Sequence, residues 1–203
     1  MLLIMSYTSI AGVLTRDEYR ARVAQLDPDL PVAVAAIDLD GFDLINDAEG
    51  FDAGDEVLRH VEVTLQAGLP GGALLAHVKG DEWVVALPDA SPEELLVVLD
   101  GLRREIAAGG RITIGAGVAG RPLHGADVDD LLAAADGALV RAKQAGGNRI
   151  TIAAEEKMVL KSSYYTRAAL HRLSKLAERT QRTEASHLRR ALDDYLGQHR
   201  ELL

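Results

Sequence analysis

The sequence has no cysteine among its 203 residues. This absence excludes disulfide frameworks, thiolate zinc sites and thiol catalysis, and it is typical of a protein from a reducing compartment. Long hydrophobic runs are also missing: the apolar opening, Met1–Met5, is far shorter than the roughly 20 residues that a membrane-spanning helix needs. It also has no basic flank or cleavage site. We therefore expect a cytoplasmic protein without a membrane segment.

Charge is divided unevenly along the chain. The formal net charge is −9, but residues 157–203 alone carry +5 and residues 1–156 carry −14. With 48% apolar and 26% charged residues, the chain can form one full domain and a smaller module. The basic end suggests binding to a polyanion, and the alternative is a solvated surface of uneven charge.

Residues 1–154 read as one α+β domain with a central antiparallel sheet. Thr15 to Glu18 has the form of a capping box, and Ser91-Pro92-Glu93-Glu94 is a strong helix start. The predicted helices cover about 16–26, 42–48, 53–66, 92–108 and 127–144, and the predicted strands 31–37, 73–78, 83–87, 111–118 and 148–153. Glu155-Glu156 is the expected junction, so the predicted domains are 1–154 and 155–203.

Four carboxylates lie where predicted strands end. Asp38 and Asp40 follow the first strand, and Asp81 and Glu82 lie at the tip of a predicted hairpin. Carboxylates at neighbouring strand ends can converge, and oxygen ligands of this kind suit Mg²⁺ carrying a nucleotide triphosphate. The alternative is an ordinary solvated hairpin tip.

Three segments carry a resemblance to a known family. They are Asp38–Asp47 followed by Gly54-Asp55, then Lys79-Gly80-Asp81-Glu82-Trp83, and Ala135–Asn148. In order and spacing these segments resemble the diguanylate cyclase (GGDEF) family over about Leu14–Ala153. The resemblance implies a nucleotide-cyclase-like fold, a ferredoxin-like palm.

The resemblance also implies roles for individual residues. It assigns Mg²⁺ to Asp38, the Leu39 carbonyl and Glu82, and it assigns the reading of guanine to Asn46 and Asp55. An amide and a carboxylate can pair with the guanine edge. The full implied nucleotide-binding set is Phe42, Asn46, Asp55, Lys79, Gly80, Asp81 and Lys143. If the site is active, Asp81 and Glu82 are its candidate catalytic residues.

Departures from the family pattern affect the phosphate side of the site. Lys79 replaces the first signature glycine, and Gly147 stands where an arginine is expected. The R-x-x-D inhibitory site is missing, since Pro70–Ala73 occupies its place. Because base-reading and metal residues are kept while phosphate contacts are lost, we interpret the domain as a sensor rather than an enzyme.

The basic tail reads as one strand and two helices, too little to bury a core alone, so a dimer is implied. Lys161–Thr166, Leu173–Thr183 and Leu188–Leu196 resemble the ribbon-helix-helix family, whose paired strands enter the DNA major groove. The implied DNA-binding residues are Leu160, Lys161, Ser162, Tyr164, Arg167, Arg182 and Thr183. The alternative is an amphipathic dimerisation tail that binds no DNA.

Together these patterns predict a homodimeric regulator, or a higher oligomer, that binds double-stranded DNA in response to a guanine nucleotide. Weakened triphosphate contacts favour cyclic di-GMP over GTP with Mg²⁺ as the ligand. The rival hypothesis is a working diguanylate cyclase that makes cyclic di-GMP from two GTP, with the tail as a dimerisation or DNA-tethering module. A third hypothesis is a scaffold whose nucleotide site is dead.

Overall fold

The structure is a computed structural model that describes residues 11–125, 127–154, 163–180 and 184–199. Its contacts divide the chain into two compact units, Met1–Glu155 and Glu156–Leu203. Each unit is described by itself. The division lies beside the junction expected at Glu155-Glu156.

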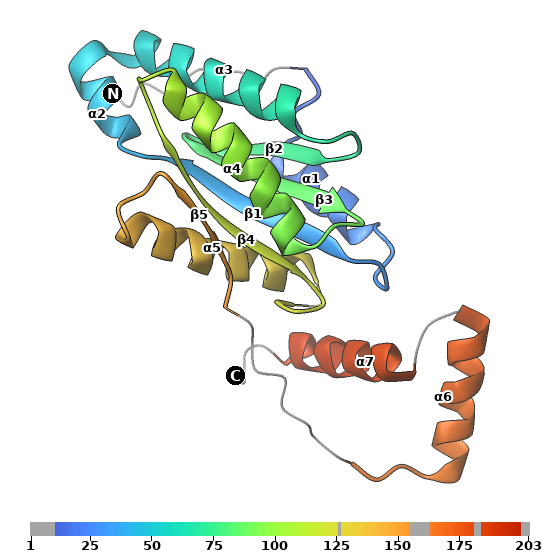
Figure 1. Cartoon of the computed structure of the whole chain (residues 1–203). Helices are drawn as coiled ribbons and strands as arrows, with labels where there is room; N and C mark the ends of the chain where they lie inside the picture. The colour runs from blue at the N-terminus through green and yellow to red at the C-terminus, as the bar shows by residue number, and fades with distance from the viewer. Residues whose placement is uncertain (1–10, 126, 155–162, 181–183, 200–203) are drawn as a thin grey trace. The chain divides into compact units, whose positions relative to one another are not determined.

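The first unit follows the predicted order of helices and strands (Figure 1). Among the described residues, no helix is both long and apolar enough to cross a membrane. The elements are α1 (Arg16–Ala24), β1 (Val32–Leu39), α2 (Phe42–Glu49), α3 (Phe51–Gly68), β2 (Leu74–Lys79), β3 (Glu82–Pro88), α4 (Pro92–Ala108), β4 (Ile114–Arg121), α5 (Val128–Gln144) and β5 (Arg149–Ile152).

The five strands form one sheet in the order β2-β3-β1-β4-β5. β1 is antiparallel to both β3 and β4, and β2 is antiparallel to β3. The prediction of an antiparallel sheet is wrong at one edge, where β5 pairs with β4 in parallel. The reason is the connection: α5 carries the chain back across the sheet, and such a crossover joins parallel strands. The α+β prediction is confirmed, with a mixed sheet.

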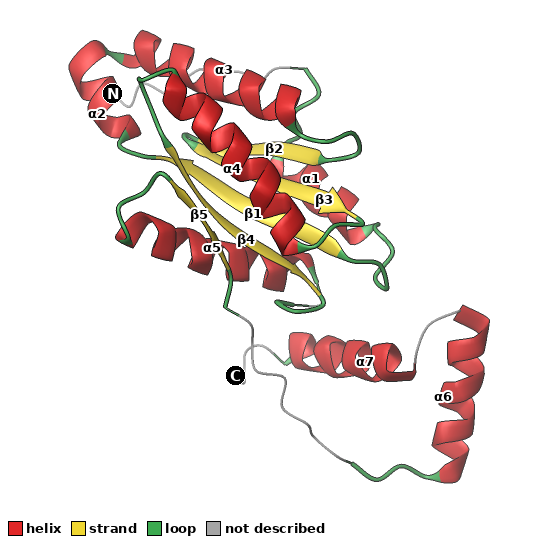
Figure 2. Cartoon of the chain, viewed as in Figure 1, coloured by secondary structure: helices red, strands yellow, loops and turns green. Residues whose placement is uncertain are grey.

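Helices cover both faces of this sheet (Figure 2). The strand β1 supplies alternate residues to two apolar cores. Ala35 and Ile37 belong to the core beneath α3 and α4, whereas Val34 and Ala36 belong to the core beneath α1 and α5. Because both faces of β1 are covered, the strand is apolar along almost its whole length.

Two helices begin with capping boxes, at the helix starts that the sequence predicts. At α1 the Thr15 hydroxyl accepts from the Glu18 amide, and the Glu18 carboxylate accepts from the Thr15 amide at 2.9 Å. At α4, Ser91 and Glu94 make the same reciprocal pair. Each cap contributes about 1 kcal/mol to stability, so these helix starts are fixed locally.

α5 approaches β4 very closely at Gly117. A Cβ added at this glycine would lie 2.8 Å from the Ala138 carbonyl carbon and closer still to the Ala135 oxygen and the Leu139 nitrogen. These are backbone atoms and cannot move aside alone. Glycine at 117 therefore allows α5 to lie on the sheet, which positions the end of the helix that carries Lys143.

The second unit contains two described helices, α6 (Arg167–Thr180) and α7 (Glu184–Gln198). Thr166 caps α6, since its hydroxyl accepts from the Ala169 amide at 3.2 Å. No residue of α6 is buried. The one strand that the sequence predicts for the basic tail would cover Lys157 to Tyr165. Residues 163–165 are in no strand, and residues 157–162 lie outside the described residues. The ribbon-helix-helix prediction is thus unsupported.

Candidate functional site

The predicted site residues meet at one edge of the sheet, where β1 ends and β3 begins. Asp38 is the register partner of Glu82, and the Leu39 amide donates to the Asp81 carbonyl at 3.3 Å. The hairpin turn therefore lies beside the end of β1, as expected for the ends of two paired strands. Asp38 and Glu82 are partly exposed, so ligands in solution can reach their carboxylates.

The carboxylates influence one another. Burial raises the pKa of Asp81 above the ordinary aspartate value, and the nearby charges of Asp38 and Glu82 raise it further. The ammonium of Lys143 acts in the opposite direction but does not cancel these effects. Clustered carboxylates with such repulsion favour the binding of a cation.

In this structure the cation among them is Lys143. Its ammonium donates to the Leu39 carbonyl at 2.6 Å, to the Asp38 carbonyl at 3.1 Å and to the Asp40 carboxylate at 2.7 Å. It also pairs with the Asp38 carboxylate. The partly exposed Lys143 therefore contacts two members of the implied Mg²⁺ set, Asp38 and the Leu39 carbonyl.

Asp40 binds three separate segments. Its carboxylate accepts from the Lys143 ammonium, from the Thr113 hydroxyl at 2.6 Å and from the Asn148 amide at 2.7 Å. Burial alone would raise the pKa of Asp40, but these hydrogen bonds outweigh burial and hold the pKa below the ordinary aspartate value. Thr113 and the Asn148 amide are not among the site residues that the sequence predicts. The only signals were a hydroxyl residue just before β4 and a glycine pair ahead of Asn148.

Gly147 explains how the loop after α5 closes on Asp40. Its φ is +68°, and an added Cβ would lie 2.5–2.8 Å from the carboxylate atoms of Asp40. A side chain at this position would be strained and would displace Asp40. Glycine at 147, where the family has an arginine, therefore allows the contacts that Asp40 makes with this loop.

The implied guanine-reading pair lies on two consecutive helices. Asn46 is on α2 and Asp55 is on α3, and the Oδ1 atom of each is buried without a hydrogen-bond partner. Gly54 makes room for this arrangement, because a Cβ there would overlap the Asn46 side chain and lie 3.2 Å from the Phe42 ring. A buried unpaired oxygen costs about 1–3 kcal/mol, which a donor on a bound ligand would offset.

The remaining implied nucleotide contacts lie around the same edge. Lys79 is 75% exposed at its side chain, and its ammonium is 3.5 Å from the Glu82 carboxylate. Gly80 has a φ of +50°, which suits the turn. Phe42 is buried as the first residue of α2, and its backbone amide lies at the helix N-terminus that favours anions.

The donor set fits Mg²⁺ held together with a nucleotide. Proteins bind this ion through one or two carboxylates plus substrate phosphates. Asp38 and Glu82 provide two carboxylates, and the Leu39 carbonyl adds a third protein oxygen. Among the described residues, no three Asp, Glu or His side chains are grouped to hold a metal ion by themselves. The site thus matches a shared metal rather than a closed protein cage.

Most implied DNA-binding residues cannot be placed. Leu160, Lys161, Ser162, Arg182 and Thr183 lie outside the described residues. Tyr164 and Arg167 are described and exposed, one before α6 and one as its first residue. No groove-facing strand is formed by the described part of this segment.

The fold and the site together define a class of nucleotide cyclase domain. The family model "Diguanylate cyclase, GGDEF domain" matches residues 15–149. This match covers more than half of the chain, so the chain belongs to the GGDEF family. The resemblance read from the three motifs is confirmed.

Individual relatives support the same assignment. The chain is 33% identical over 130 residues to response regulator PleD of Caulobacter vibrioides, covering 59% of this chain and 29% of PleD. It is 31% identical over 130 residues to diguanylate cyclase DosC of Escherichia coli, covering 60% of this chain and 28% of DosC. The chain therefore spans less than a third of the length of these relatives.

A solved structure extends the likeness to three dimensions. The active GGEEF domain of a diguanylate cyclase from Vibrio cholerae matches with a TM-score of 0.62 and 28% identity, covering 69% of this chain and 94% of that domain. The nucleotide-cyclase-like fold prediction is thereby confirmed for the first unit.

These findings correct the predicted function. The prediction of a guanine-nucleotide-responsive transcriptional regulator is wrong, because the matching family and the relatives are those of diguanylate cyclases. Double-stranded DNA as a partner has no support from them. The rival hypothesis, an enzyme that makes cyclic di-GMP, fits better.

Proposed function

We propose that the first unit is a working diguanylate cyclase that converts two GTP into cyclic di-GMP and two pyrophosphates. In each of two equivalent steps, the 3′-hydroxyl of one nucleotide attacks the α-phosphorus of the other. A phosphodiester P–O bond forms, the P–O bond to pyrophosphate breaks, and the hydroxyl proton is lost to a base. The observation that carries the proposal is the pair of unpaired buried oxygens on Asn46 and Asp55, beside a carboxylate cluster that attracts a cation.

Asn46 and Asp55 select the base. Guanine offers N–H donors at N1 and at its exocyclic amino group, whereas adenine offers a different pattern on the same edge. The unpaired Oδ1 atoms of these two residues are acceptors. The pair therefore suits guanine and leaves at least one oxygen unpaired with adenine.

Asp38, Glu82 and the Leu39 carbonyl hold the metal ion in this proposal. When bound, Mg²⁺ supplies charge neutralisation and polarisation of a phosphoryl oxygen. Lys143 now contacts the Asp38 and Leu39 oxygens, and its flexible ammonium can turn to phosphate once those oxygens have another cation. The residues themselves therefore bind and orient the triphosphate.

Lys79 replaces the cation that is missing at Gly147. Its largely exposed side chain projects from the signature turn, and its ammonium is already within 3.5 Å of Glu82. A lysine is a mobile point charge that binds phosphate readily. Lys79 thus contributes a phosphate contact, and the departures in the motif are compatible with turnover.

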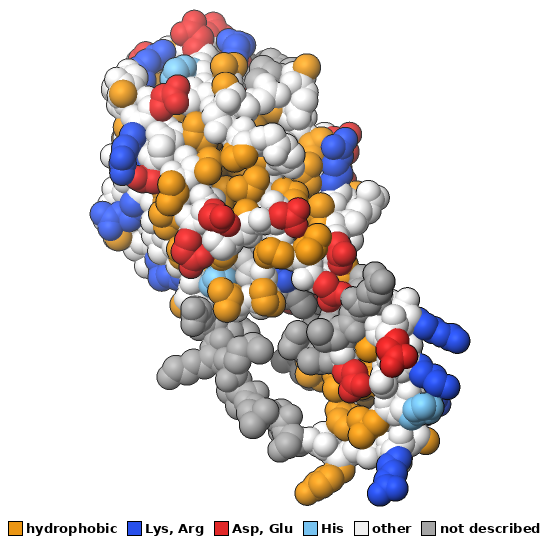
Figure 3. All heavy atoms as spheres, turned by 45° about the vertical axis from the view of Figure 1, so that its right-hand side comes forward, with side chains coloured by type: hydrophobic (Ala, Val, Ile, Leu, Met, Phe, Trp, Pro, Cys, Tyr) orange, Lys and Arg blue, Asp and Glu red, His pale blue; other side chains and the backbone are white. Residues whose placement is uncertain are grey.

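The second unit supplies dimerisation. Two GTP-bearing sites must face each other for the reaction, and one chain has one site. The second unit exposes large apolar side chains on both helices, several of which are visible in Figure 3. The set is Leu170, Leu176, Leu188, Leu192, Tyr195 and Leu196. Burial of this surface against a second copy would stabilise both partners.

Incubation of the pure protein with GTP and Mg²⁺ tests the activity directly. We expect many molecules of cyclic di-GMP per protein chain, measured by chromatography with mass detection. Less than one product molecule per chain, in a protein for which calorimetry still shows GTP binding, would contradict the proposed enzyme activity. Only nucleotide binding would then remain.

The role of the second unit is tested by concentration. The rate per chain should rise with protein concentration and then level off as the dimer forms, and sedimentation should show the same transition. Leu176→Asp combined with Leu192→Asp should move both transitions to higher concentration. The control Arg172→Asp changes charge on the same helix without removing an apolar side chain.

A further inference from the structure

A buried carboxylate lies behind the signature turn, outside the nucleotide site. Glu62 on α3 has no exposed surface and is the one fully buried acidic side chain among the described residues. Its carboxylate accepts a hydrogen bond from the Trp83 indole N–H at 3.0 Å. An ionisable group is retained in a core only when it is paired or hydrogen-bonded.

His77 connects this carboxylate to the turn. Its ring stacks on Trp83 with centroids 4.9 Å apart and an interplanar angle of 17°. Its Nδ1 atom lies 3.8 Å from the Glu62 carboxylate, and its Nε2 atom lies 2.8 Å from the Gly80 carbonyl. A carbonyl only accepts, so His77 Nε2 carries the hydrogen and donates to Gly80.

The hairpin is irregular at the point where His77 acts. His77 pairs with Trp83 in register, but the register shifts between His77 and Lys79, next to the turn. A register shift of this kind disrupts the ladder of hydrogen bonds locally. The bond from His77 to Gly80 restrains a turn that the ladder restrains poorly.

The contacts form a continuous path from α3 to the turn: Glu62 to Trp83 and His77, and His77 to Gly80. The turn at Gly80-Asp81 and the residue after it, Glu82, carry the carboxylates of the nucleotide site. We infer that Glu62 and His77 are positioning residues that fix the Lys79–Glu82 turn, and thereby the reach of Asp81 and Glu82 toward the phosphates and metal. The part of this inference that concerns turnover rests on the proposed function.

A merely structural role for His77 predicts a different result. His77→Phe keeps the ring on Trp83 and most of the packing, but it removes the donor to Gly80. His77→Gln replaces the donor, since the amide nitrogen of glutamine lies close to where Nε2 lies in histidine. If only the packing of the ring matters, His77→Phe should preserve the turn better than His77→Gln. If the hydrogen bond to Gly80 matters, His77→Gln should preserve it better.

The first measurement needs no ligand. Amide hydrogen exchange of peptides that cover residues 79–82 should be about three- to tenfold faster in His77→Phe than in the native chain. His77→Gln should return it to near the native rate. His60→Phe, a change at an exposed histidine of α3, should have no effect. Equal exchange in the native, Phe and Gln proteins would overturn the inference, whether or not the chain is an enzyme.

The second measurement uses GTP and Mg²⁺. His77→Phe should lower kcat by about 10- to 100-fold, because small misplacements of reacting groups have effects of this size. It should raise the Mg²⁺ concentration for half-maximal rate, while the preference for GTP over inosine triphosphate stays unchanged, since Asn46 and Asp55 lie elsewhere. A native protein that is inactive would defeat the proposed function but leave the exchange result to decide this inference.

Trp83 is the single tryptophan, so its emission reports on this path. Glu62→Leu removes the acceptor of the indole N–H and should shift the emission to shorter wavelength, with faster exchange at 79–82. Glu62→Gln keeps an acceptor oxygen and should retain the native spectrum. If Glu62→Leu does not fold, the two His77 variants still decide. An unchanged spectrum in a folded Glu62→Leu protein would contradict the path.

Discussion

The two halves of the nucleotide site are prepared in opposite ways. On the phosphate side, the oxygens of Asp38, Leu39 and Asp40 are already bound by the Lys143 ammonium. On the base side, Asn46 and Asp55 each keep one buried oxygen without a partner. A bound ligand or metal ion must therefore displace the Lys143 ammonium from oxygens on the phosphate side. On the base side, a ligand can donate hydrogen bonds to oxygens that have no partner.

This difference teaches what each half contributes. In the proposed function, the phosphate side serves the reaction and depends on a cation, because its oxygens would exchange the Lys143 ammonium for another cation. The base side serves selection in that proposal, because a ligand donor would offset the desolvation cost of an unpaired buried acceptor.

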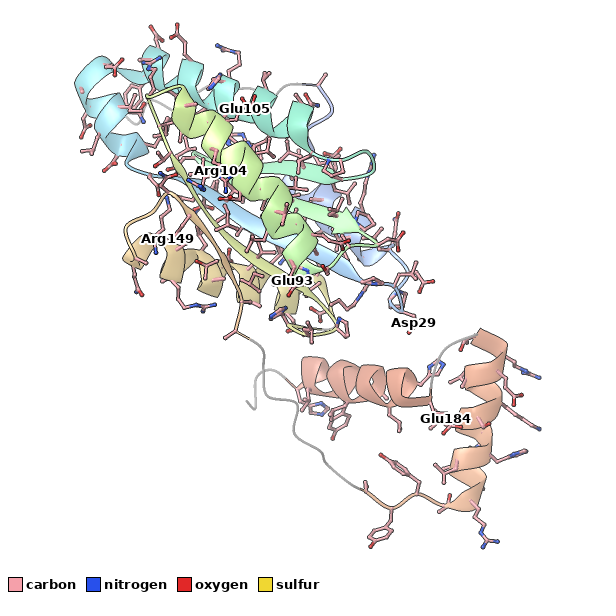
Figure 4. The ribbon with its side chains drawn as sticks, viewed as in Figure 1. Asp29, Glu93, Arg104, Glu105, Arg149 and Glu184 are labelled. Atoms are coloured by element: carbon pink, nitrogen blue, oxygen red, sulfur yellow. The ribbon has the colours of Figure 1, made fainter. Side chains whose placement is uncertain are left out.

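Removal of a metal carboxylate should give the largest effect. Glu82→Gln and Asp38→Asn should each lower cyclic di-GMP formation by about 10²–10³-fold, since charge stabilisation of a developing phosphoryl transition state is lost. Chelation by EDTA should abolish product, and added Mg²⁺ should restore it. The matched control is Glu93→Gln. Glu93 lies at the N-terminal end of α4 (Figure 4), which is near the start of β1, whereas Asp38 lies near the end of that strand. If Glu82→Gln keeps full activity, the phosphate side is assigned wrongly.

Removal of a base contact should give a smaller and more selective effect. Asp55→Ala should weaken GTP binding by about 10- to 100-fold, as expected for a hydrogen bond to a charged group. Inosine triphosphate lacks the exocyclic amino group, so the native preference for GTP over inosine triphosphate should shrink in the variant. Calorimetry with both nucleotides measures this, with Asp52→Ala on the exposed side of α3 as control. A preference that survives Asp55→Ala would show that other groups read the base.

The strand end and the hairpin tip that carry the carboxylates are predicted from local signals, whereas the base-reading roles of Asn46 and Asp55 come from the family resemblance and stay a prediction. Asn46 and Asp55 lie in helices with regular apolar spacing, and Asp38 follows a strand that is apolar on both faces. The position of Glu82 beside Asp38 required only the hairpin and its pairing to β1. Local turn chemistry and hydrophobic periodicity determine where these helices and strands begin and end, but not the roles of the residues on them.

The contacts of Lys143 and Asp40 could not be predicted from local sequence signals. Lys143 is about 100 residues from the β1 end that it contacts, and its place depends on how closely α5 lies on β4 at Gly117. The parallel pairing of β5 likewise depends on the path of α5 over the sheet. The sequence departures at Lys79 and Gly147 were read as losses, because the contacts that accommodate them are tertiary.

The loop glycines provide a matched test of the phosphate side. Gly146 and Gly147 both have positive φ, but an added Cβ meets nothing within 4 Å at Gly146 and meets the Asp40 carboxylate at Gly147. Gly146→Ala should cost about 1 kcal/mol from backbone strain. Gly147→Ala should cost about 1–2 kcal/mol more, by displacement of Asp40. Urea unfolding measures both; equal losses would mean that the loop yields and the Asp40 contacts are not tight.

The smallest expected effects are on the pH dependence of stability. Two aspartates of the phosphate side, Asp40 and Asp81, should change stability with pH in opposite directions. The folded pKa of Asp40 is lowered, so the unfolded chain binds more protons there. Its stabilising contribution is present above the unfolded pKa of about 4 and is lost as pH falls through the folded pKa. The folded pKa of Asp81 is raised by burial and by its acidic neighbours. Its contribution to stability therefore decreases as pH rises from about 4 through that raised value.

Unfolding curves of Asp40→Asn and Asp81→Asn between about pH 3 and pH 6 separate the two slopes. Asp40→Asn should flatten the loss of stability at the acid end, because the folded variant no longer has a carboxylate with a lowered pKa at this position. Asp81→Asn should remove the decrease in stability that Asp81 causes at the upper end of this pH range. Added Mg²⁺ with GTP should reduce the Asp81 effect in the native protein, since a bound cation offsets the repulsion from Asp38 and Glu82. Parallel curves for both variants would mean that Lys143 already neutralises the phosphate side completely, and that the contrast with the base side lies only in hydrogen bonding.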